Sequence, residues 1–314
     1  MKIPDETLHW LLAGDVAIQY QVHRDLLDDD RPDLQVRIAT EGWGARFLAA
    51  RNPNGHWGHS FYQPKWISSH YTLLDLCHLG LPPNHPDALE TIHLILKESK
   101  DEQGGINPHR SPGAPGDVCV SGMFLNYACH FGVEAEPLYS IIDYLIPQQM
   151  PDGGFNCQQE YGSPVHSSLH STLSVLEGIH AYLVNDYDYR RSELAKIADQ
   201  GQAFILQHKL FKSDHSGEII DPRMLMLSFP PRWRYDILRA LDYFRAAQVG
   251  YQSAMQPALD VLAKKQRKDG RWPVQARHPG QTHFDMEQTG QPSRWTTLRA
   301  LRVARWYVSG KDQI

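Results

Sequence analysis

Apolar positions along this chain recur at helical period, and two kinds of segment alternate. The first kind is amphipathic, because charged residues interrupt the apolar positions at regular intervals. Its members span Pro4–Leu12, Leu34–Ala50, Pro86–Lys97, Glu134–Gln149, Glu193–His208 and Ser253–Gln266. We expect each of them to form a helix with one solvent-exposed face.

The second kind of segment carries fewer charges and more aromatic and small residues. Several members begin after Pro or Gly and at Ser or Asp, which is typical of helix starts. They span Asp15–Leu27, Pro64–Leu79, Asp117–Phe131, Val165–Leu183, Pro231–Ala247 and Pro292–Tyr307. We expect helices that are buried on most sides.

The alternation predicts a helix-turn-helix unit that recurs roughly every fifty residues, in six copies. A turn with an Asn-Gly, Gly-Gly or Asp-Gly corner joins the two helices of a unit, and Gly there supplies the positive φ that the corner needs. Copies of this turn are Asn54-Gly55-His56-Trp57-Gly58, Glu102-Gln103-Gly104-Gly105-Ile106, Pro151-Asp152-Gly153-Gly154-Phe155 and Lys268-Asp269-Gly270-Arg271-Trp272. The stretch Lys212–Pro230 lacks a clean copy, which indicates an insertion.

Two of these turns follow a Gln, as in Gln149-Met150-Pro151-Asp152-Gly153-Gly154-Phe155 and Gln266-Arg267-Lys268-Asp269-Gly270-Arg271-Trp272. This pattern resembles the repeat of squalene and oxidosqualene cyclases and of protein prenyltransferase β subunits. The resemblance covers nearly the whole chain and implies one all-α domain over residues 1–314. That domain would be an (α/α)6 toroid, a double ring of six inner and six outer helices around a central cavity.

The resemblance extends to a metal site. In protein prenyltransferase β subunits, a Gly-Gly turn leads through an Arg into an Asp-x-Cys helix start, and a His at the next inner helix completes a zinc site. Gly104-Gly105, Arg110, Asp117-Val118-Cys119 and His166 are similar in order and position. The resemblance therefore implies that Asp117, Cys119 and His166 are catalytic residues that bind zinc through thiolate, imidazole and carboxylate ligands.

Other ligand sets stay open. His170 lies one helical turn beyond His166 and would project on the same face, and Cys157 would add a fourth ligand. Two departures weaken the match, because Val120 replaces an aromatic residue and the stretch from Ser111 to Gly116 lacks the expected Lys. In the alternative interpretation, Asp117 caps a helix, Cys119 is a small core residue and the histidines are hydrogen-bonded polar groups.

Aromatic residues and arginines gather where the second kind of segment begins. Aromatic faces stabilise carbocations and arginine forks bind diphosphate, so these residues are candidates to bind substrate. They are Trp66, Tyr71, Trp233, Tyr235 and Trp295, with Arg110, Arg232, Arg234 and Arg294. Ordinary packing of helix ends is the alternative for each single residue.

Several motifs are missing from the sequence. A class II terpene cyclase protonates its substrate with an Asp-x-Asp-Asp motif, and its absence disfavours proton-initiated cyclisation. Asp29-Asp30-Arg31-Pro32-Asp33 matches the Asp-Asp-x-x-Asp magnesium motif, but its Pro-containing linker context indicates a solvated turn. No Gly-x-Ser-x-Gly, Walker or Gly-x-Gly-x-x-Gly motif occurs, so we expect no nucleotide cofactor.

Composition narrows the choice further. The chain has 314 residues and a net charge of −5, which argues against a nucleic-acid partner. Four cysteines in a chain of this size favour free thiols or ligands over a disulfide framework. The first residues lack the apolar core of a signal peptide, and no apolar run reaches the ~18 residues of a membrane span, so we expect a cytoplasmic protein.

These observations favour an enzyme similar to prenyltransferases and terpene cyclases, acting on an apolar isoprenoid-like or diphosphate substrate with the help of zinc. The resemblance also implies an α subunit as partner, and the sequence itself identifies none. Two alternatives stay open: a non-catalytic toroid that binds an apolar ligand, and a carbohydrate-active (α/α)6 enzyme.

Overall fold

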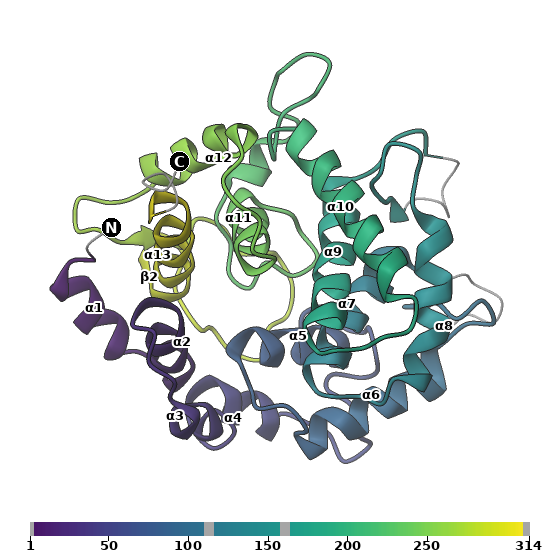
Figure 1. Ribbon diagram of the computed structural model, residues 1–314. Coiled ribbons are helices and arrows are strands. Elements are labelled where there is room, and N and C mark those ends of the chain that lie inside the picture. Colours follow the sequence, from purple (N-terminus) through teal and green to yellow (C-terminus); the bar gives the residue numbers. More distant parts are fainter. Residues whose placement is uncertain (1–2, 110–115, 158–163, 310–314) are drawn as a thin grey trace. The chain divides into compact units, whose positions relative to one another are not determined.

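The structure is a computed structural model that describes residues 3–109, 116–157 and 164–309. Helices dominate these residues, as the all-α prediction requires (Figure 1). The chain divides into two compact units. Unit 1 comprises Met1–Phe47, Leu79–Leu81 and Leu206–Ile314, and unit 2 comprises Leu48–His78 and Pro82–Ile205.

Unit 1 contains the helices from the two ends of the chain. They are α1 (Asp5–Leu12), α2 (Val16–Leu26), α3 (Pro32–Arg37), η3 (Pro222–Leu225), α11 (Ile237–Ala246), η4 (Ser253–Met255), α12 (Gln256–Lys264) and α13 (Arg294–Ser309). Helix α4 (Gly42–Ala49) begins in unit 1 and ends in unit 2. Helix α13 packs against both α2 and α11, and these three form the centre of the unit (Figure 1).

Unit 2 contains the central helices. They are α6 (Pro86–Ser99), α7 (Val118–His130), α8 (Glu136–Leu145), η1 (Ile146–Gln148) and α9 (Leu169–Val184), with most of α5 (Ser69–Leu79) and α10 (Arg191–Gln207). Helices α7 and α9 lie side by side (Figure 1). Helix α7 is buried along almost its whole length, and its buried side chains include Val120, Phe124 and Leu125.

The twelve helical segments predicted from the sequence all contain a helix in the described part of the chain. One predicted outer segment, Leu34–Ala50, is divided into α3 and α4. The reason is Gly42, which lies at a φ of 61° and therefore interrupts the helical backbone. The predicted solvated turn before α3 is confirmed, because Asp29 and Asp30 are exposed and outside any helix.

Three of the helices predicted to be inner begin at least four residues later than predicted. Helix α5 begins at Ser69 rather than Pro64, and α11 begins at Ile237 rather than Pro231. Trp66 has a φ of 72° and Arg232 a φ of 58°, and a right-handed helix cannot contain either conformation. Helix α9 begins at Leu169, after an extended Ser168, so Val165 precedes it and is 84% exposed.

The predicted repeat is visible in the hydrogen bonds of the turns. In four turns, a backbone N–H donates to the carbonyl of the residue three positions earlier, from Gly55, Gly104, Gly153 and Gly270. The first apolar residue after each turn then donates its N–H to a hydroxyl at the following inner helix. These pairs are Trp57 with Ser69, Ile106 with Ser121, Phe155 with Thr172 and Trp272 with Thr297.

The glutamine that precedes two of the turns has one role in both. The side chains of Gln149 and Gln266 donate to the carbonyls of Gly153 and Gly270, at 2.9 and 3.0 Å. This glutamine thus closes the turn on itself. The sequence pattern behind the resemblance therefore corresponds to a repeated local structure in each unit.

The described residues contain very little β-structure. Strands β1 (Trp272–Pro273) and β2 (Pro292–Ser293) pair antiparallel, with Trp272 opposite Ser293. None of the described helices combines the length and the apolar character that a membrane span requires. The closed toroid and the single domain over residues 1–314 stay predictions, since each unit is described by itself.

Candidate functional site

The candidate site begins at the turn before α7. One carboxylate oxygen of Asp101 accepts from the N–H groups of Gln103 and Gly105, and the other accepts from the N–H of Gly116 at 2.5 Å. The N–H of Asp117 donates to the carbonyl of Ile106 at 3.0 Å. These bonds fix the backbone directly before α7 and so determine where Asp117 lies.

Asp117 and Cys119 occupy the start of α7. Asp117 is the N-cap residue, and its Oδ1 accepts from the N–H of Val120 at 2.9 Å. The capping role considered from the sequence is therefore confirmed. A carboxylate has two oxygens with several lone pairs, so capping through Oδ1 leaves acceptor capacity on the same side chain. Cys119, two residues later, is only 8% exposed.

Cys157 comes from the next repeat, just after the turn at Gly153 and Gly154. Its backbone N–H donates to the hydroxyl of Ser171 in α9 at 3.2 Å. The carboxylate of Asp152 accepts from the N–H and the hydroxyl of Ser167, just before that helix. The first turn of α9 thus holds the segment that carries Cys157.

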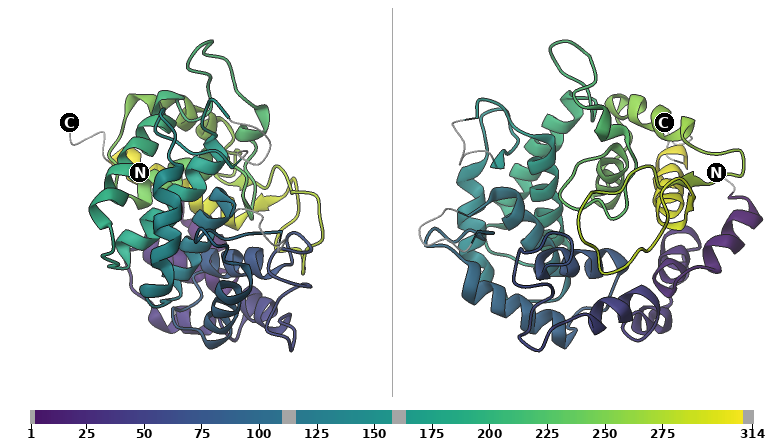
Figure 2. Two further views of the ribbon diagram at one scale, coloured as in Figure 1. Left: turned by 90° about the vertical axis from the view of Figure 1, so that its right-hand side faces the viewer. Right: turned by 180° about the vertical axis from the view of Figure 1, so that it is seen from behind.

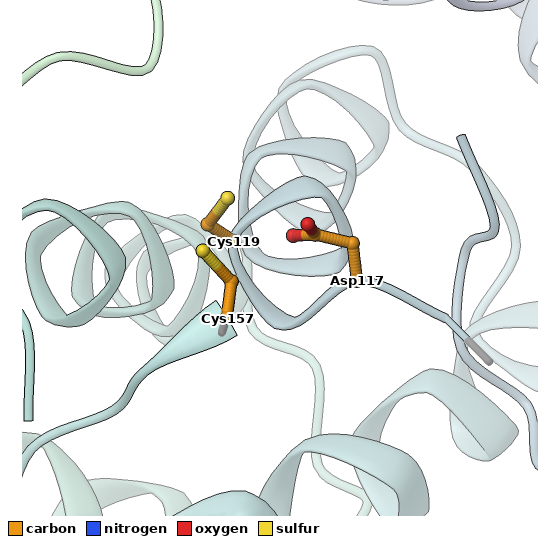
Figure 3. Close-up of side chains that lie close together, drawn as sticks. All are labelled: Asp117, Cys119 and Cys157. Carbon is orange, nitrogen blue, oxygen red and sulfur yellow. The ribbon is translucent and has the colours of Figure 1, made fainter. Parts of the chain in front are cut away.

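The structure brings Asp117, Cys119 and Cys157 together. One ligand atom from each side chain lies within 4.8 Å of the others. Figure 3 shows the carboxylate of Asp117 directed toward the two cysteines and the two thiols close to each other. Two thiols and a carboxylate are a ligand set that zinc accepts, and three protein ligands with an open fourth position are typical of catalytic zinc.

The two thiols differ in acidity because they interact with each other. The hydrogen bond with Cys157, burial and the nearby Asp117 together raise the pKa of Cys119 well above its usual value. The same hydrogen bond lowers the pKa of Cys157, against the effects of burial and of Asp117. Cys157 is therefore the thiol that loses its proton first.

The histidines proposed as ligands are placed elsewhere. His166 is exposed and precedes α9, and its backbone carbonyl accepts from the side chain of Asn156. His170 lies in the first turn of α9 but does not belong to the group formed by Asp117, Cys119 and Cys157. Arg110 lies outside the described residues.

A group of aromatic rings surrounds Tyr62 in the same unit. The hydroxyls of Tyr62 and Tyr71 are 2.9 Å apart, and Trp66 packs edge-on against Tyr71 at 4.7 Å between ring centroids. Burial raises the pKa of Tyr62, and the charges of Cys119, Asp117 and Cys157 raise it further. The Tyr62 hydroxyl therefore lies in the electrostatic field of the cysteine and aspartate group.

Tyr62 was not predicted as a site residue. It lies in a loop between two helices, whereas the aromatic residues predicted to bind substrate lie near predicted helix starts. The run Phe61-Tyr62 within that loop was the only available signal. Trp66 and Tyr71 were predicted to bind substrate, and both are buried in this group.

The remaining predicted substrate residues lie in unit 1. Trp295 is buried and stacks on Phe229, with 4.6 Å between ring centroids. Arg294 donates to the carbonyl of Trp10 at 2.9 Å, and Arg234 lies over the ring of Trp233 at 4.7 Å. Tyr235 is buried. The proposal that these residues share one cavity with Trp66 and Tyr71 stays a prediction, because the two sets belong to different units.

Comparisons with known proteins show only distant structural similarity. No family model matches the chain, and no curated protein sequence matches it. Among solved structures, a polysaccharide lyase is similar at 14% identity and a TM-score of 0.49, over 95% of this chain and 90% of the lyase. The type II terpene cyclase MstE from Scytonema is similar at 14% identity and a TM-score of 0.35, over 86% and 96% of the two chains. Its variant in complex with geranylgeranyl dihydroxybenzoate gives 15% and 0.34, over 90% and 97%.

Proposed function

We propose that Asp117, Cys119 and Cys157 bind a zinc ion, and that the protein is an enzyme acting on an apolar, isoprenoid-like substrate. One observation carries this proposal: a carboxylate and two thiols from two separate segments lie within 4.8 Å of one another. Cysteine thiolates are among the preferred ligands of zinc, and a carboxylate can complete the set.

The donor set fits zinc better than the hard cations. Calcium and magnesium prefer oxygen ligands, whereas the two sulfur atoms of Cys119 and Cys157 favour a softer metal. The hydroxyl of Ser171 supports the second cysteine, because it accepts a hydrogen bond from the backbone N–H of Cys157. Supporting contacts of this type orient the ligands of known metal sites.

Zinc bound at this position would supply Lewis-acid chemistry by lowering the pKa of a thiol or water nucleophile. The residues of the chain have separate tasks. Tyr62 stays a neutral phenol at physiological pH because its pKa is raised, and its hydroxyl is held by Tyr71. The rings of Tyr62, Trp66 and Tyr71 offer electron-rich faces that attract a developing carbocation and exclude water.

Metal analysis of protein purified without added metal tests the proposal. We expect roughly one zinc per chain, as in sites with three protein ligands. Cys119→Ala and Cys157→Ala should each remove most of the zinc while circular dichroism shows an intact helical fold. Cys77→Ala is the matched control, because Cys77 is a free cysteine outside the group.

His166→Ala separates the observed group from the ligand set that the resemblance implies. Zinc that survives His166→Ala but not Cys157→Ala supports the proposed set. Zinc that is lost with His166 would instead support the prenyltransferase-like set. Protein that stays free of zinc after reconstitution would contradict the proposal and favour a metal-free protein that binds an apolar ligand.

Substrate is tested with a prenyl diphosphate such as farnesyl diphosphate, with and without a small thiol. We expect release of diphosphate that depends on zinc and is lost in Cys119→Ala. Tyr62→Phe retains the ring but removes the hydroxyl, so it should reduce the rate without removing zinc. A rate that is equal in wild type and Cys119→Ala would exclude a role of the group in catalysis.

A further inference from the structure

A pocket in unit 1 has no part in the proposed zinc site. It has a volume of about 220 Å³, and all the residues that line it belong to unit 1. None of the residues predicted to bind substrate lines it, apart from Arg232, which was considered for diphosphate. Its walls are the stretch Phe229–Arg232 and the loop 277–287, which can be followed in Figure 2 as the yellow-green segment leading to β2.

Hydrogen bonds anchor both walls of this pocket. The N–H of Gln275 donates to the carbonyl of Leu227 at 3.1 Å, which joins the two walls at one end. At the other end, Glu287 accepts from the N–H of Arg294 at 2.6 Å and from the hydroxyl of Ser293. The carboxylate of Glu287 therefore fastens the loop to the start of α13.

Two contacts of Arg277 also connect the two ends of the loop 277–287. Arg277 forms an ion pair with Asp285 at 2.6 Å and donates to the backbone carbonyl of Glu287 at 2.9 Å. Arg46 lies over the ring of Phe284, 3.8 Å from its centroid. The pocket is thus formed by the folded chain itself, which is the usual state of a small-molecule site.

Aromatic rings form the apolar part of the pocket. Phe47 and Phe284 contact each other with 4.6 Å between centroids, and His283 meets Phe47 edge-on at 5.6 Å. Phe229 is stacked on Trp295. Flat surfaces of this kind favour a planar ligand, because rings pack on rings in offset or edge-on geometry.

Arg232 supplies a buried positive charge at the same place. It lines the pocket, is only 5% exposed and lies at a φ of 58°. For a residue other than Gly this conformation costs roughly 1–3 kcal/mol, and such strain concentrates at ligand-binding sites. The strained backbone at Arg232 thus accompanies a guanidinium that is held inside the unit.

The two imidazoles of the pocket are buried and lie near arginines. Burial lowers the pKa of His278 to about 4, and Arg234 and Arg232 lower it further. Burial and Arg232 also lower the pKa of His283 to about 4. Both rings are therefore neutral at pH 7.

We propose that this pocket binds a small planar carboxylate, such as an aromatic acid, with its carboxylate on Arg232 and its ring against the phenylalanines that line the pocket. A guanidinium binds a carboxylate with two parallel hydrogen bonds. Asp285 and Glu287 line the same pocket and would repel a doubly or triply charged diphosphate more strongly than a singly charged carboxylate. The volume lies below the roughly 300–1,000 Å³ of drug-sized ligand sites, so the ligand is small.

Calorimetric titration of the full chain with benzoate, benzamide and inorganic diphosphate tests this inference. We expect saturable one-to-one binding of benzoate, and at least roughly tenfold weaker binding of benzamide, which lacks the charge. Equal binding of benzamide would remove the role of Arg232. Tighter binding of diphosphate than of benzoate, or no saturable benzoate binding, would overturn the proposal.

Two variants locate the binding. Arg232→Gln should weaken benzoate at least roughly tenfold, whereas Arg223→Gln, at an exposed arginine outside the pocket, should not change it. Thr282→Tyr fills the pocket from an exposed position and should abolish binding, so it decides the matter if Arg232→Gln does not fold. Undiminished binding in Thr282→Tyr would place the ligand elsewhere. The result does not depend on zinc or on the activity proposed for unit 2.

Discussion

Buried charges join the central helices of unit 1, whereas close backbone contact joins helices α7 and α9 of unit 2. In unit 1, Asp242 of α11 forms ion pairs with Arg299 and Arg302 of α13 and with Arg245. Arg302 also pairs with Asp25 of α2 at 2.8 Å. The three helices at the centre of the unit thus share one ionic network.

In unit 2, two glycines bring α7 and α9 together. A Cβ on Gly178 would lie 2.3 Å from the carbonyl oxygen of Gly122, and a Cβ on Gly122 would lie 2.7 Å from the Cα of Val175. Both distances are far shorter than real contacts permit. The helices therefore touch through their backbones, where any side chain would hold them apart.

The difference explains where each candidate site arises. The close approach of α7 and α9 brings the start of α7 next to the segment before α9, so Cys119 and Cys157 meet. In unit 1 the network lies along the helices α2, α11 and α13, and the pocket lies in the loops before α11 and α13. Packing and site are thus coupled in unit 2 and separate in unit 1.

Removing the central carboxylate of unit 1 should have the largest effect. Burial alone would raise the pKa of Asp242, but Arg302, Arg245 and Arg299 lower it well below its usual range. Asp242→Asn leaves these arginines without their counter-charge and should cost about 3–5 kcal/mol of unfolding free energy. Urea denaturation measures this loss. The matched control is Asp33→Asn, whose ion pair with Arg31 is exposed and screened by solvent, so its loss should change stability far less.

Amide hydrogen exchange shows which unit loses stability in Asp242→Asn. Asp242→Asn should increase exchange in α2, α11 and α13 and leave α7 and α9 protected. A variant as stable as the control, or one that loses protection first in α7 and α9, would show that the ionic network does not hold unit 1 together.

The sequence predicted the helices well because their signal is local. Periodic apolar positions and Gly-containing turns lie within one repeat, and the same turn hydrogen bonds recur at Gly153 and Gly270. The starts of α5 and α11 were wrong because Trp66 and Arg232 adopt positive φ, which sequence pattern does not reveal for a residue other than Gly. The sequence repeats Arg-Ala-Leu at Arg239-Ala240-Leu241 and at Arg299-Ala300-Leu301, but this spacing does not reveal that Asp242 pairs with Arg299.

The candidate sites were harder to predict because they depend on contacts between repeats. Asp117 and Cys119 share one helix start, so the sequence could name both. The choice among Cys157, His166 and His170 depends on how Ser171 and Asp152 hold the next turn. The pocket in unit 1 is lined by the loop 277–287, which has no periodic pattern and was not singled out.

Acidification should affect unit 2 through His70. This side chain is fully buried, its Nδ1 lies 3.2 Å from the hydroxyl of Tyr127, and burial lowers its pKa to about 3. The unfolded chain has a His pKa near 6.5. Below that value the unfolded state binds a proton that the folded state does not, so stability falls as the pH falls from about 6.5 toward 3.

The expected size is about 2 kcal/mol between pH 6.5 and pH 5, from 1.36 kcal/mol per unit of pH. His70→Phe keeps an aromatic ring among Phe61, Tyr62 and Tyr71 and should be less sensitive to pH by this amount. The control His215→Gln changes an exposed histidine and should keep the wild-type slope. Parallel pH profiles for wild type and His70→Phe would mean that His70 can take up its proton within the folded unit.

The smallest effect is expected from a single methyl group between α7 and α9. Gly178→Ala gains roughly 1 kcal/mol of helix propensity but forces the two backbones apart, which typically costs about 1–3 kcal/mol. The net loss should therefore be about 0–2 kcal/mol, with increased hydrogen exchange in α7 and α9 and no increase in α2, α11 and α13.

Gly250→Ala is the control for Gly178→Ala. A Cβ at Gly250 meets nothing within 4 Å, and its φ is not positive, so this variant should change stability by less than about 0.5 kcal/mol. Because α7 carries Cys119 and α9 holds the segment with Cys157, Gly178→Ala should also weaken zinc binding, whereas Gly250→Ala should not. A Gly178→Ala protein that is more stable than wild type would show that helix propensity decides, and that the backbones of α7 and α9 are not in close contact.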